Sequence, residues 1–386
     1  MRSLIILTEV YDPEKFIIND LVKSFLEKNI KISLVTRVPS YPTGIPFKGY
    51  KNRLKKHKIS ENFEVYRFPV FKGYGKSKVK KILNFLFQPF WYFYIFIFHL
   101  KKHDAMFVYQ TGSLYNYSLI FPKLKSQKAV IWSQDLWPDA AKENGLKSEL
   151  FLKLLHSISK KILNRFEVLS QSRSFHSYYL EKYDINSKVL YCFSEKPNNT
   201  NELDNECDVK GKLLYAGNLG SVQNLKELFS TYETLYHQKI VKFLDVFGGG
   251  SQYKRYKDQY ENRLGIRFKG PYEHEDLFEA KKKYEFLIFS LNPGIMRKVV
   301  PGRFVFCVNN NLPILYIGDG EISELIKEYK IGISVNDNDK CIENSIREIQ
   351  DFRKIDTKEL RDNFTLIESN FDKNNIINEI HKSLGL

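Results

Sequence analysis

The chain has 386 residues, 43% of them hydrophobic, and a formal net charge of +15. This length is too great for one typical core and the apolar content is ample for globular packing, so two domains are expected. The charge is one-sided: residues 1–195 carry 32 Lys and Arg against 16 Asp and Glu, whereas residues 196–386 carry 28 against 29. The basic half implies an anionic partner, which is a membrane surface, a polyphosphate or a nucleic acid.

Short apolar runs alternate with helical patterns along the first half, which is typical of a parallel α/β sheet. Strands are predicted at residues 4–9, 31–36, 63–70, 105–110, 130–135, 166–170 and 188–193. Helices are predicted at residues 15–29, 78–100, 113–125 and 148–164. The Pro- and Gly-rich stretch between the second and third strands is predicted to be a loop.

Residues 82–100 form an uncharged, aromatic-rich stretch of 19 residues that contains Trp91. Its length is just sufficient for a membrane-spanning helix. Pro89 and the density of aromatic side chains favour a helix that lies at the headgroup boundary of a membrane, while a buried core helix is a further alternative. The lysines before this stretch, which would add attraction for anionic lipids, are Lys78, Lys80 and Lys81.

Residues 130–140 read as a buried strand that ends on a polar tip at Asp135. Ligands of open α/β sheets bind beyond the carboxyl ends of the strands, which would put Asp135 at such a crevice. Trp132 and Trp137 flank it and offer flat apolar faces that suit sugar rings and interfaces. The alternative is an ordinary strand end at which Asp135 caps the next helix.

A polar stretch without periodicity, residues 196–211, is predicted to link the two domains. The α/β pattern then restarts. Strands are predicted at residues 212–217, 243–248, 266–270, 286–291, 313–318 and 331–335, and helices at 224–238, 340–352, 357–368 and 372–385. We therefore expect two Rossmann-like domains, 1–195 and 212–370, and a terminal segment, 371–386, that can pack back on the first.

Glycine-rich turns follow two predicted strands of the second half. Their residues include Gly217, Asn218, Gly220, Gly248 and Gly249. Such turns let the backbone approach a ligand closely and expose N–H groups to a phosphate at the start of the next helix. An ordinary tight turn or a plain loop is the alternative at both places.

A third segment, residues 290–321, joins a strand end to a cationic helix start and then to a second Gly-rich strand end. Its notable residues are Arg297, Lys298, Gly302, Arg303 and Glu321. A helix N-terminus with three cations around it is a candidate diphosphate site. The alternative for Arg297 and Lys298 is a solvated loop.

Five motifs occur in the order that a known family shows. They read PSYPTG at 39–44, SQDLWP at 133–138, YAGNLG with Gln223 at 215–223, SL-P and VPGRF at 290–304, and GDGE at 318–321. On these motifs, which span most of the sequence, the chain resembles the retaining GT-B glycosyltransferases of family 4. Within that family it is most similar to bacterial O-antigen and capsule transferases of the N-acetyl-fucosamine type.

The resemblance implies an α/β protein of the GT-B fold, with two doubly wound Rossmann-like domains facing a cleft. It implies a retaining hexosyltransferase that moves an N-acetylated or 6-deoxy hexose from a nucleotide-sugar, expected to be UDP-linked. The acceptor would be a polyprenyl-diphosphate-linked glycan of O-antigen, capsule or lipopolysaccharide synthesis. The enzyme would be cytoplasmic and peripheral, on the anionic inner face of the bacterial cytoplasmic membrane. Neither a metal nor any other cofactor nor a nucleic-acid partner is expected.

The resemblance also assigns roles to residues. Asp135 would be catalytic, by orienting or deprotonating the acceptor hydroxyl or by stabilising positive charge at the anomeric carbon. The donor would be bound by Gly217, Asn218, Gly220, Gly248, Gly249, Lys298, Gly302, Arg303 and Glu321. The acceptor or the membrane would be contacted by Tyr41, Trp132, Trp137, Lys78, Lys80, Lys81 and Trp91.

The sequence departs from the family pattern at positions expected to hold the donor. Residues 11–18 lack the paired glycines that usually lie beside the donor phosphates. Where the family usually has Arg and Lys, this sequence has Asn218 and Gln223 or Asn224. Where the family has its two Glu residues, this sequence has Lys298 and Phe306. Phe306 cannot accept hydrogen bonds from ribose hydroxyls. These departures motivate a second hypothesis, a non-catalytic GT-B subunit that binds a membrane or a partner transferase.

Overall fold

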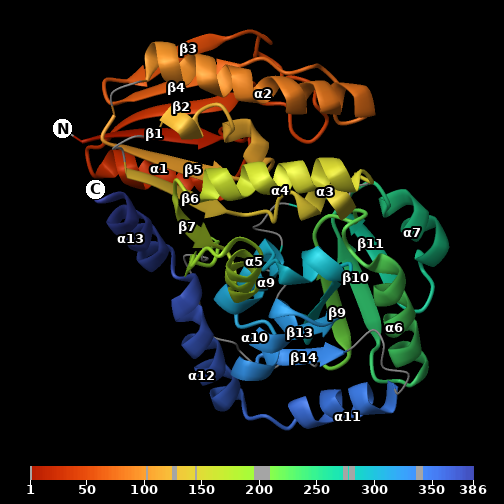
Figure 1. Cartoon of the computed structure of the whole chain (residues 1–386). Helices are drawn as coiled ribbons and strands as arrows, with labels where there is room; N and C mark the ends of the chain where they lie inside the picture. Colours follow the sequence, from red (N-terminus) through yellow and green to blue (C-terminus); the bar gives the residue numbers. More distant parts are fainter. Residues whose placement is uncertain are drawn as a thin grey trace. The chain divides into compact units, whose positions relative to one another are not determined.

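The structure is a computed structural model of the whole chain, which divides into two compact units, Met1–Tyr191 with Asn374–Leu386 and Cys192–Lys373 (Figure 1). It describes residues 2–100, 103–123, 128–143, 146–194, 209–272, 277, 283–335 and 342–386. The predicted linker 196–211 lies outside the described residues except for its last three positions.

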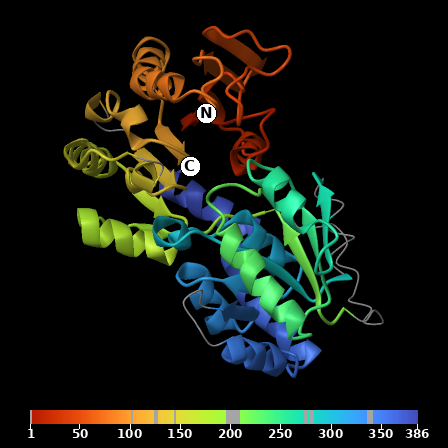
Figure 2. The same cartoon turned by 90° about the vertical axis from the view of Figure 1, so that its right-hand side faces the viewer.

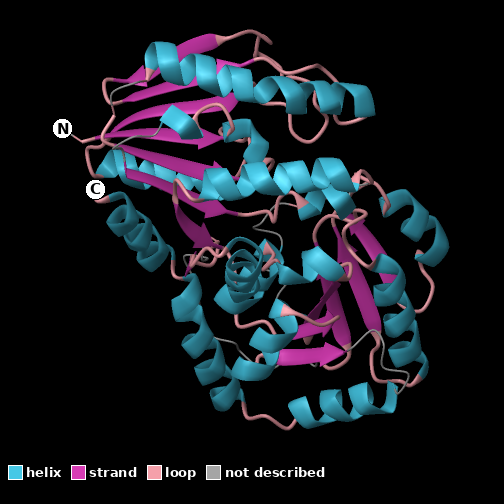
Figure 3. Ribbon diagram, viewed as in Figure 1, coloured by secondary structure: helices cyan, strands magenta, loops and turns pink. Residues whose placement is uncertain are grey.

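The first unit is built on an eight-stranded sheet in the order β3-β4-β2-β1-β5-β6-β7-β8 (Figure 3). Its strands are β1 Ser3–Thr8, β2 Lys31–Arg37, β3 Lys55–Ser60, β4 Phe63–Phe68, β5 Ala105–Gln110, β6 Lys128–Ser133, β7 Glu167–Ser170 and β8 Lys188–Val189. All neighbours pair in parallel except β3 and β4, which are antiparallel. The central strands are buried on both faces, which explains their continuous apolar sequences.

Six helices belong to this unit: α1 Ile17–Glu27, α2 Lys78–His99, α3 Asp139–Glu143, α4 Glu149–Leu163, α5 Arg173–Tyr183 and α13 Lys373–Leu384. The predicted helix at 113–125 is wrong, because the chain there forms two short 3₁₀ turns, Leu114–Tyr117 and Phe121–Lys123. Pro122 in the second turn has no backbone N–H and cannot extend a helical hydrogen-bond ladder.

Strand β3 was not expected from the sequence, since KKHKIS has no apolar alternation. It pairs with β4 in an antiparallel hairpin at the edge of the sheet, with Lys55 opposite Arg67 and Lys58 opposite Glu64. An edge strand rich in lysine is ordinary in natural sheets, because charge there discourages pairing with other chains. The ladder with β4, rather than local propensity, forms this strand.

The second unit contains a six-stranded, all-parallel sheet in the order β11-β10-β9-β12-β13-β14. Its strands are β9 Lys212–Ala216, β10 Phe243–Phe247, β11 Ile266–Gly270, β12 Phe286–Ser290, β13 Ile314–Ile317 and β14 Gly332–Val335. Its helices include α6 Leu225–His237, α7 Tyr253–Tyr260, α9 Gly302–Asn309, α10 Glu321–Tyr329, α11 Ile342–Phe352 and α12 Thr357–Glu368, and Figure 2 shows α6 lying along the sheet.

The C-terminal helix α13 packs on the first unit. His381 lies with its ring centroid 4.6 Å from that of Phe25 on α1, and Lys188 at β8 forms an ion pair with Glu379. His381 is buried and neither of its ring nitrogens has a hydrogen-bond partner in the described part of the chain. Burial and, as the smaller cause, the charge of Lys28 together lower the pKa of His381 to about 4.

We predict that His381 makes stability fall as the pH drops. The pKa of His381 is lower in the folded chain than the usual 6.5, so the unfolded chain binds the proton more tightly between pH 6.5 and 4. The loss at pH 5 is on the order of 2 kcal/mol. Thermal melts at pH 7.5 and 5 should show a smaller drop in Tm for His381→Phe than for the wild type. The exposed His237→Gln control should behave as the wild type, and an equal drop in all three proteins would contradict this account.

Candidate functional site

Buried polar side chains gather where β1, β2 and β5 end in the first unit. Glu9 directly follows β1, and its Oε2 lies 3.2 Å from Nη1 of Arg37, the last residue of β2. Nδ2 of Asn116, which lies beyond β5, donates a hydrogen bond of 2.5 Å to Oε1 of Glu9. The Glu9 carboxylate is therefore held from two sides, by Arg37 at the end of β2 and by Asn116 in the turn beyond β5, as a charge with little access to water requires.

The turns around Glu9 are tied together by side-chain to backbone hydrogen bonds. Nε2 of Gln110, the last residue of β5, donates to the carbonyl oxygens of Gly112 at 2.5 Å and Asp135 at 3.1 Å. The hydroxyl of Ser133 donates to Oε1 of Gln110 at 2.7 Å. A Cβ at Gly112 would come 2.3 Å from Oε1 of Glu9, so a larger residue at this turn would have to displace the Glu9 carboxylate. The β5 and β6 turns are thus fixed against each other and against Glu9.

Asp135 lies two residues after β6, in the turn that Gln110 holds. It is partly exposed, does not cap α3, and its carboxylate has no hydrogen-bond partner among the residues that the structure describes. Burial raises the pKa of Asp135 to about 7, and the negative charge of Glu9 adds to the effect. A carboxyl group that titrates near neutral pH can both accept and donate a proton, which is the property required of a general base or acid.

Sequence reasoning missed Glu9 and Arg37. The signal that could have found Glu9 is the one used for Asp135, a polar residue directly after a buried strand. Since β1 and β6 run parallel in one sheet, their carboxyl ends lie at the same edge. Arg37 gave a weaker signal, because a cation at a strand end looks like any solvated residue until its burial is known.

The aromatic residues predicted to face an acceptor or a membrane divide into buried and accessible ones. Trp132 is a correction: its side chain is fully buried in the sheet and its Nε1 donates to the Leu190 carbonyl at 2.9 Å, so it presents no surface. Trp137 is partly exposed and packs against Phe85 of α2, with ring centroids 5.7 Å apart. Tyr41 is half exposed.

Helix α2 has one packed face and one exposed apolar face. The packed face carries Asn84, Gln88, Pro89, Tyr92, Ile95 and Phe96. The exposed face carries apolar residues that mostly lie three or four positions apart: Val79, Ile82, Leu86, Phe87, Phe90, Tyr94 and Phe98. Lys78, Lys80 and Lys81 are exposed at the helix start. Trp91 is partly exposed. In the described residues α2 is also the one helix with the length and hydropathy of a membrane span, although a third of its apolar window is buried.

In the second unit, the ends of β9 and β10 approach each other without side chains between them. A Cβ on Gly248 would overlap the carbonyl oxygen of Gly217, and both residues have φ near +137°, where L residues are strained. Asn218 is exposed between them and Gly220, and its amide lies against Gly220 and Gly250. Both glycine turns are therefore required by the fold itself.

Arg303, in the first turn of α9, reaches back to these strand ends. Its guanidinium lies 5.2 Å from the ring centroid of Tyr215 and 5.6 Å from that of Phe289. A Cβ on Gly217 would come 2.7 Å from its Nη2. Nη1 is buried and has no hydrogen-bond partner within the described residues. A guanidinium held by two rings with an unsatisfied N–H group is arranged to receive an anion.

Two further glycines near this cation are not required by packing. A Cβ on Gly249 or Gly302 would meet no atom within 4 Å, and neither residue has a positive φ. Open space over glycine at a strand end and at the N-terminus of α9 leaves room for a ligand to approach the backbone N–H groups. Gly302 is exposed, next to Arg303.

The remaining predicted donor residues differ in accessibility. Arg297 is buried and bonded to Asp319 at 2.8 Å, so it fixes the 3₁₀ turn Gly294–Lys298 rather than standing in solvent. Lys298 is partly exposed. Glu321 is a correction: at the first turn of α10 its side chain has no exposed surface, so it offers nothing to a ligand. Phe306 is buried within α9.

We predict that the ionised carboxylate of Asp135 destabilises the folded chain at alkaline pH. Because the pKa of Asp135 is raised to about 7 in the folded chain, its ionisation is easier in the unfolded chain, and stability falls between pH 4 and 7. Asp135→Asn should therefore raise Tm at pH 8 and change it little at pH 4, with an upper bound of roughly 4 kcal/mol. Glu9→Gln should lower the pKa of Asp135.

Asp139, the first residue of α3, provides a control of opposite sign four residues away. Burial opposes the effect, but hydrogen bonds from Tyr178 and Lys182 hold the pKa of Asp139 below its usual value. Its stabilising contribution is present above the usual pKa of 3.8 and is lost as the pH falls below it. Asp139→Asn should thus lower Tm at pH 8. An Asp135→Asn variant that also loses stability at pH 8 would show that the Asp135 carboxylate is not desolvated.

No family model and no curated protein matches the chain. Solved structures do match over nearly their whole length. Sucrose-phosphate synthase from Thermosynechococcus elongatus is 12% identical with a TM-score of 0.67, covering 99% of this chain and 98% of that one. HepE from Anabaena, in complex with UDP, is 13% identical with a TM-score of 0.65 and covers 100% of both chains. WaaG, a glycosyltransferase involved in lipopolysaccharide biosynthesis, is 11% identical with a TM-score of 0.61 and covers 98% of both.

At these identities the likeness concerns the fold. Each unit of this chain has the α/β sheet that such proteins contain, parallel throughout in the second unit and parallel except for β3 in the first. The predicted fold class is confirmed: the chain has the GT-B fold of glycosyltransferases.

Proposed function

We propose that the protein is a glycosyltransferase that takes a sugar from a nucleotide-sugar. The observation that carries the proposal is Arg303, whose buried Nη1 has no partner in the described part of the chain and whose guanidinium faces the glycine turn at β9. A diphosphate supplies the paired oxygen acceptors that a guanidinium binds best. The leaving group of such a transfer is a nucleoside diphosphate, so the same cation would stabilise the charge that develops on it.

The donor is proposed to be UDP-linked. Among proteins of this fold, HepE was observed in complex with UDP. A Cβ on Gly249 or on Gly302, which directly precedes Arg303, would meet open space, and this suits close approach of a nucleotide to backbone N–H groups. Since Glu321 is buried, we assign donor contact to Gly217, Gly302, Arg303 and Lys298, and no metal is required in this proposal.

Asp135 is proposed to act on the acceptor. Its carboxyl group titrates near neutral pH, because burial and the Glu9 charge raise its pKa to about 7. In a retaining transfer it would orient the acceptor hydroxyl, take its proton, or stabilise positive charge at the anomeric carbon. The sugar is proposed to be an N-acetylated or 6-deoxy hexose, and the acceptor a polyprenyl-diphosphate-linked glycan of O-antigen or capsule synthesis.

A nucleotide panel tests the donor assignment. Thermal shift with UDP, GDP, CMP and UDP-linked N-acetylhexosamines, including 6-deoxy forms, should give stabilisation by the UDP family. Arg303→Gln should weaken UDP binding about tenfold or more, because a charge-assisted hydrogen bond contributes roughly 1.5–3 kcal/mol.

Arg255→Gln is the matched control for Arg303→Gln. Arg255 also lies over a ring, that of Tyr256, at 5.5 Å, but it is exposed on α7. This variant should bind UDP as the wild type does. If no nucleotide changes the Tm of folded wild-type protein, the donor site is refuted and a non-catalytic GT-B subunit is favoured. Lys298 and the buried Phe306, which stand at the family's Glu positions, also fit that role.

The protein is further proposed to be peripheral on the anionic inner face of the cytoplasmic membrane, through the exposed face of α2. Phe90→Glu with Phe98→Glu should abolish co-sedimentation with anionic liposomes, because both side chains are more than half exposed. The matched control is Leu150→Glu with Leu154→Glu on α4, which are as exposed but lie on another helix. Equal losses in both pairs would point to unspecific adhesion instead.

A further inference from the structure

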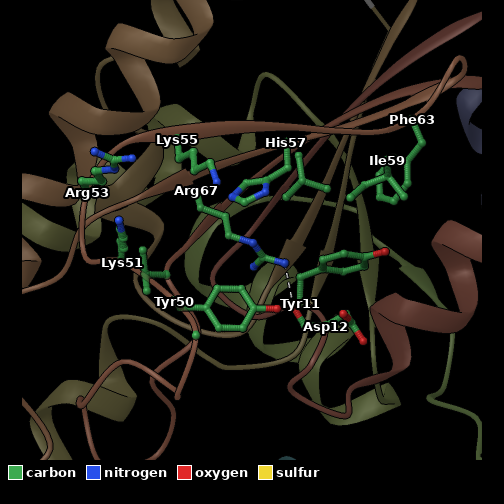
Figure 4. A pocket seen from close by; sticks show the side chains of 13 residues that line it. Tyr11, Asp12, Tyr50, Lys51, Arg53, Lys55, His57, Ile59, Phe63 and Arg67 are labelled. Atoms are coloured by element: carbon green, nitrogen blue, oxygen red, sulfur yellow. Dashed lines mark hydrogen bonds between the residues drawn. The ribbon is translucent and has the colours of Figure 1, made fainter.

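A second cationic pocket lies in the first unit, beside the hairpin of β3 and β4 (Figure 4). Its volume is about 400 Å³. It is lined from three parts of the chain: the segment after β1, the loop that follows β2, and the β3–β4 hairpin. The residues that matter are Tyr11, Tyr50, Lys51, Arg53, Lys55, His57 and Arg67.

The pairing of β3 with β4 decides which side chains face this pocket. Lys55 is opposite Arg67 and His57 is opposite Val65, and all four line the cavity. The residues between them, Lys56 and Lys58, point to the other face of the hairpin, because successive side chains of a strand alternate. Basic residues therefore occur on both faces, but their surroundings differ.

The lysines on the other face are neutralised. Nζ of Lys56 lies 2.7 Å from Oε2 of Glu64, and Nζ of Lys58 lies 2.6 Å from Oε1 of Glu61. Within the described ranges, Lys51, Arg53 and Lys55 have no carboxylate oxygen within 4 Å. The pocket face thus keeps an unpaired positive charge, whereas the other face does not.

Arg67 forms the floor of the pocket. It is 6% exposed, and its Nη2 donates to the carbonyl oxygen of Asp12 at 2.7 Å. Its guanidinium lies 5.2 Å from the ring centroid of Tyr50 and 5.9 Å from that of Tyr11 (Figure 4). Nη1 is buried and has no hydrogen-bond partner among the described residues. A buried guanidinium N–H without a partner costs free energy that an anionic ligand would recover.

Other charges in the pocket fit this arrangement. Burial lowers the pKa of His57, and the charges of Lys55 and Arg67 lower it further, so His57 is neutral at pH 7 and can donate or accept a hydrogen bond. Asp12 lines the pocket and is its one carboxylate among the lining residues, against four permanent cations. The local balance remains strongly positive.

We propose that this pocket binds a phosphoryl group, a phosphate or a diphosphate, with Arg67 at its floor and Lys51, Arg53 and Lys55 around its mouth. The group can belong to a soluble molecule or to a lipid headgroup, since both present the same oxygen acceptors. All the residues of this site belong to the first unit, whereas Arg303 belongs to the second. Phosphate binding at this site does not depend on whether the chain transfers a sugar.

Calorimetric titration with inorganic pyrophosphate tests the proposal on the full chain. Lys51→Gln with Lys55→Gln should weaken binding about tenfold, which corresponds to about 1.4 kcal/mol for the two exposed lysines together. Arg67→Met should abolish it. The matched control is Lys56→Gln with Lys58→Gln, which removes the same charge from the same hairpin on the opposite face and should bind as the wild type does.

The outcomes separate cleanly. Equal weakening in both lysine pairs, or no pyrophosphate binding by folded wild-type protein, would overturn the proposal. If Arg67→Met fails to fold by circular dichroism, the two lysine pairs decide alone. Vesicles containing phosphatidic acid show whether the phosphoryl group belongs to a lipid or to a soluble molecule. If pyrophosphate displaces the wild-type protein from these vesicles, and the Lys51→Gln, Lys55→Gln variant loses this effect, the ligand is a lipid headgroup. Pyrophosphate binding without such competition assigns a soluble ligand.

Discussion

The carboxylate of Glu9, at the carboxyl end of β1 and 13% exposed, is the constraint on which the first unit's candidate site depends. A charge in that position is expensive unless it is paired, and Arg37 and Asn116 supply the pairing from β2 and from beyond β5. The same charge acts on Asp135, whose desolvated carboxyl already resists ionisation. Glu9 thus lies against the turn at Gly112, and its charge adds to the effect of burial on the pKa of Asp135.

The second unit uses the opposite charge in a comparable way. Gly217 and Gly248 bring two strand ends into contact, and Arg303 lies over the rings of Tyr215 and Phe289 with one N–H group unsatisfied. Parallel sheets make such sites available, because polar side chains that follow buried strands converge at one edge. In both units one partly buried charge, Glu9 in the first and Arg303 in the second, gives the strand ends their chemistry.

Much of the fold was predictable from the sequence, and less of the candidate site was. Strands such as β1 and β12 are buried on both faces, so they read as continuous apolar runs, and their alternation with helices predicted the α/β class. The GT-B fold was implied only by the resemblance of five motifs to a known family. Strand β3 could not be found, because pairing with β4 forms it, and the 113–125 helix failed at Pro122. Trp132 and Glu321 were misassigned because residue type does not reveal burial. Arg67 could not be identified as a binding residue from sequence, because the cavity that it lines forms only in the folded chain.

The most direct test of the account is transfer by Asp135→Asn. With a UDP-sugar identified by binding and a lipid-linked acceptor, turnover and UDP affinity would be measured for this variant and for the wild type. The account predicts transfer by the wild type, and in the variant a loss of turnover with unchanged UDP affinity and an intact fold. Turnover equal to that of the wild type would contradict it, because the carboxyl group that Glu9 and burial hold near neutral pKa would then have no part in the reaction.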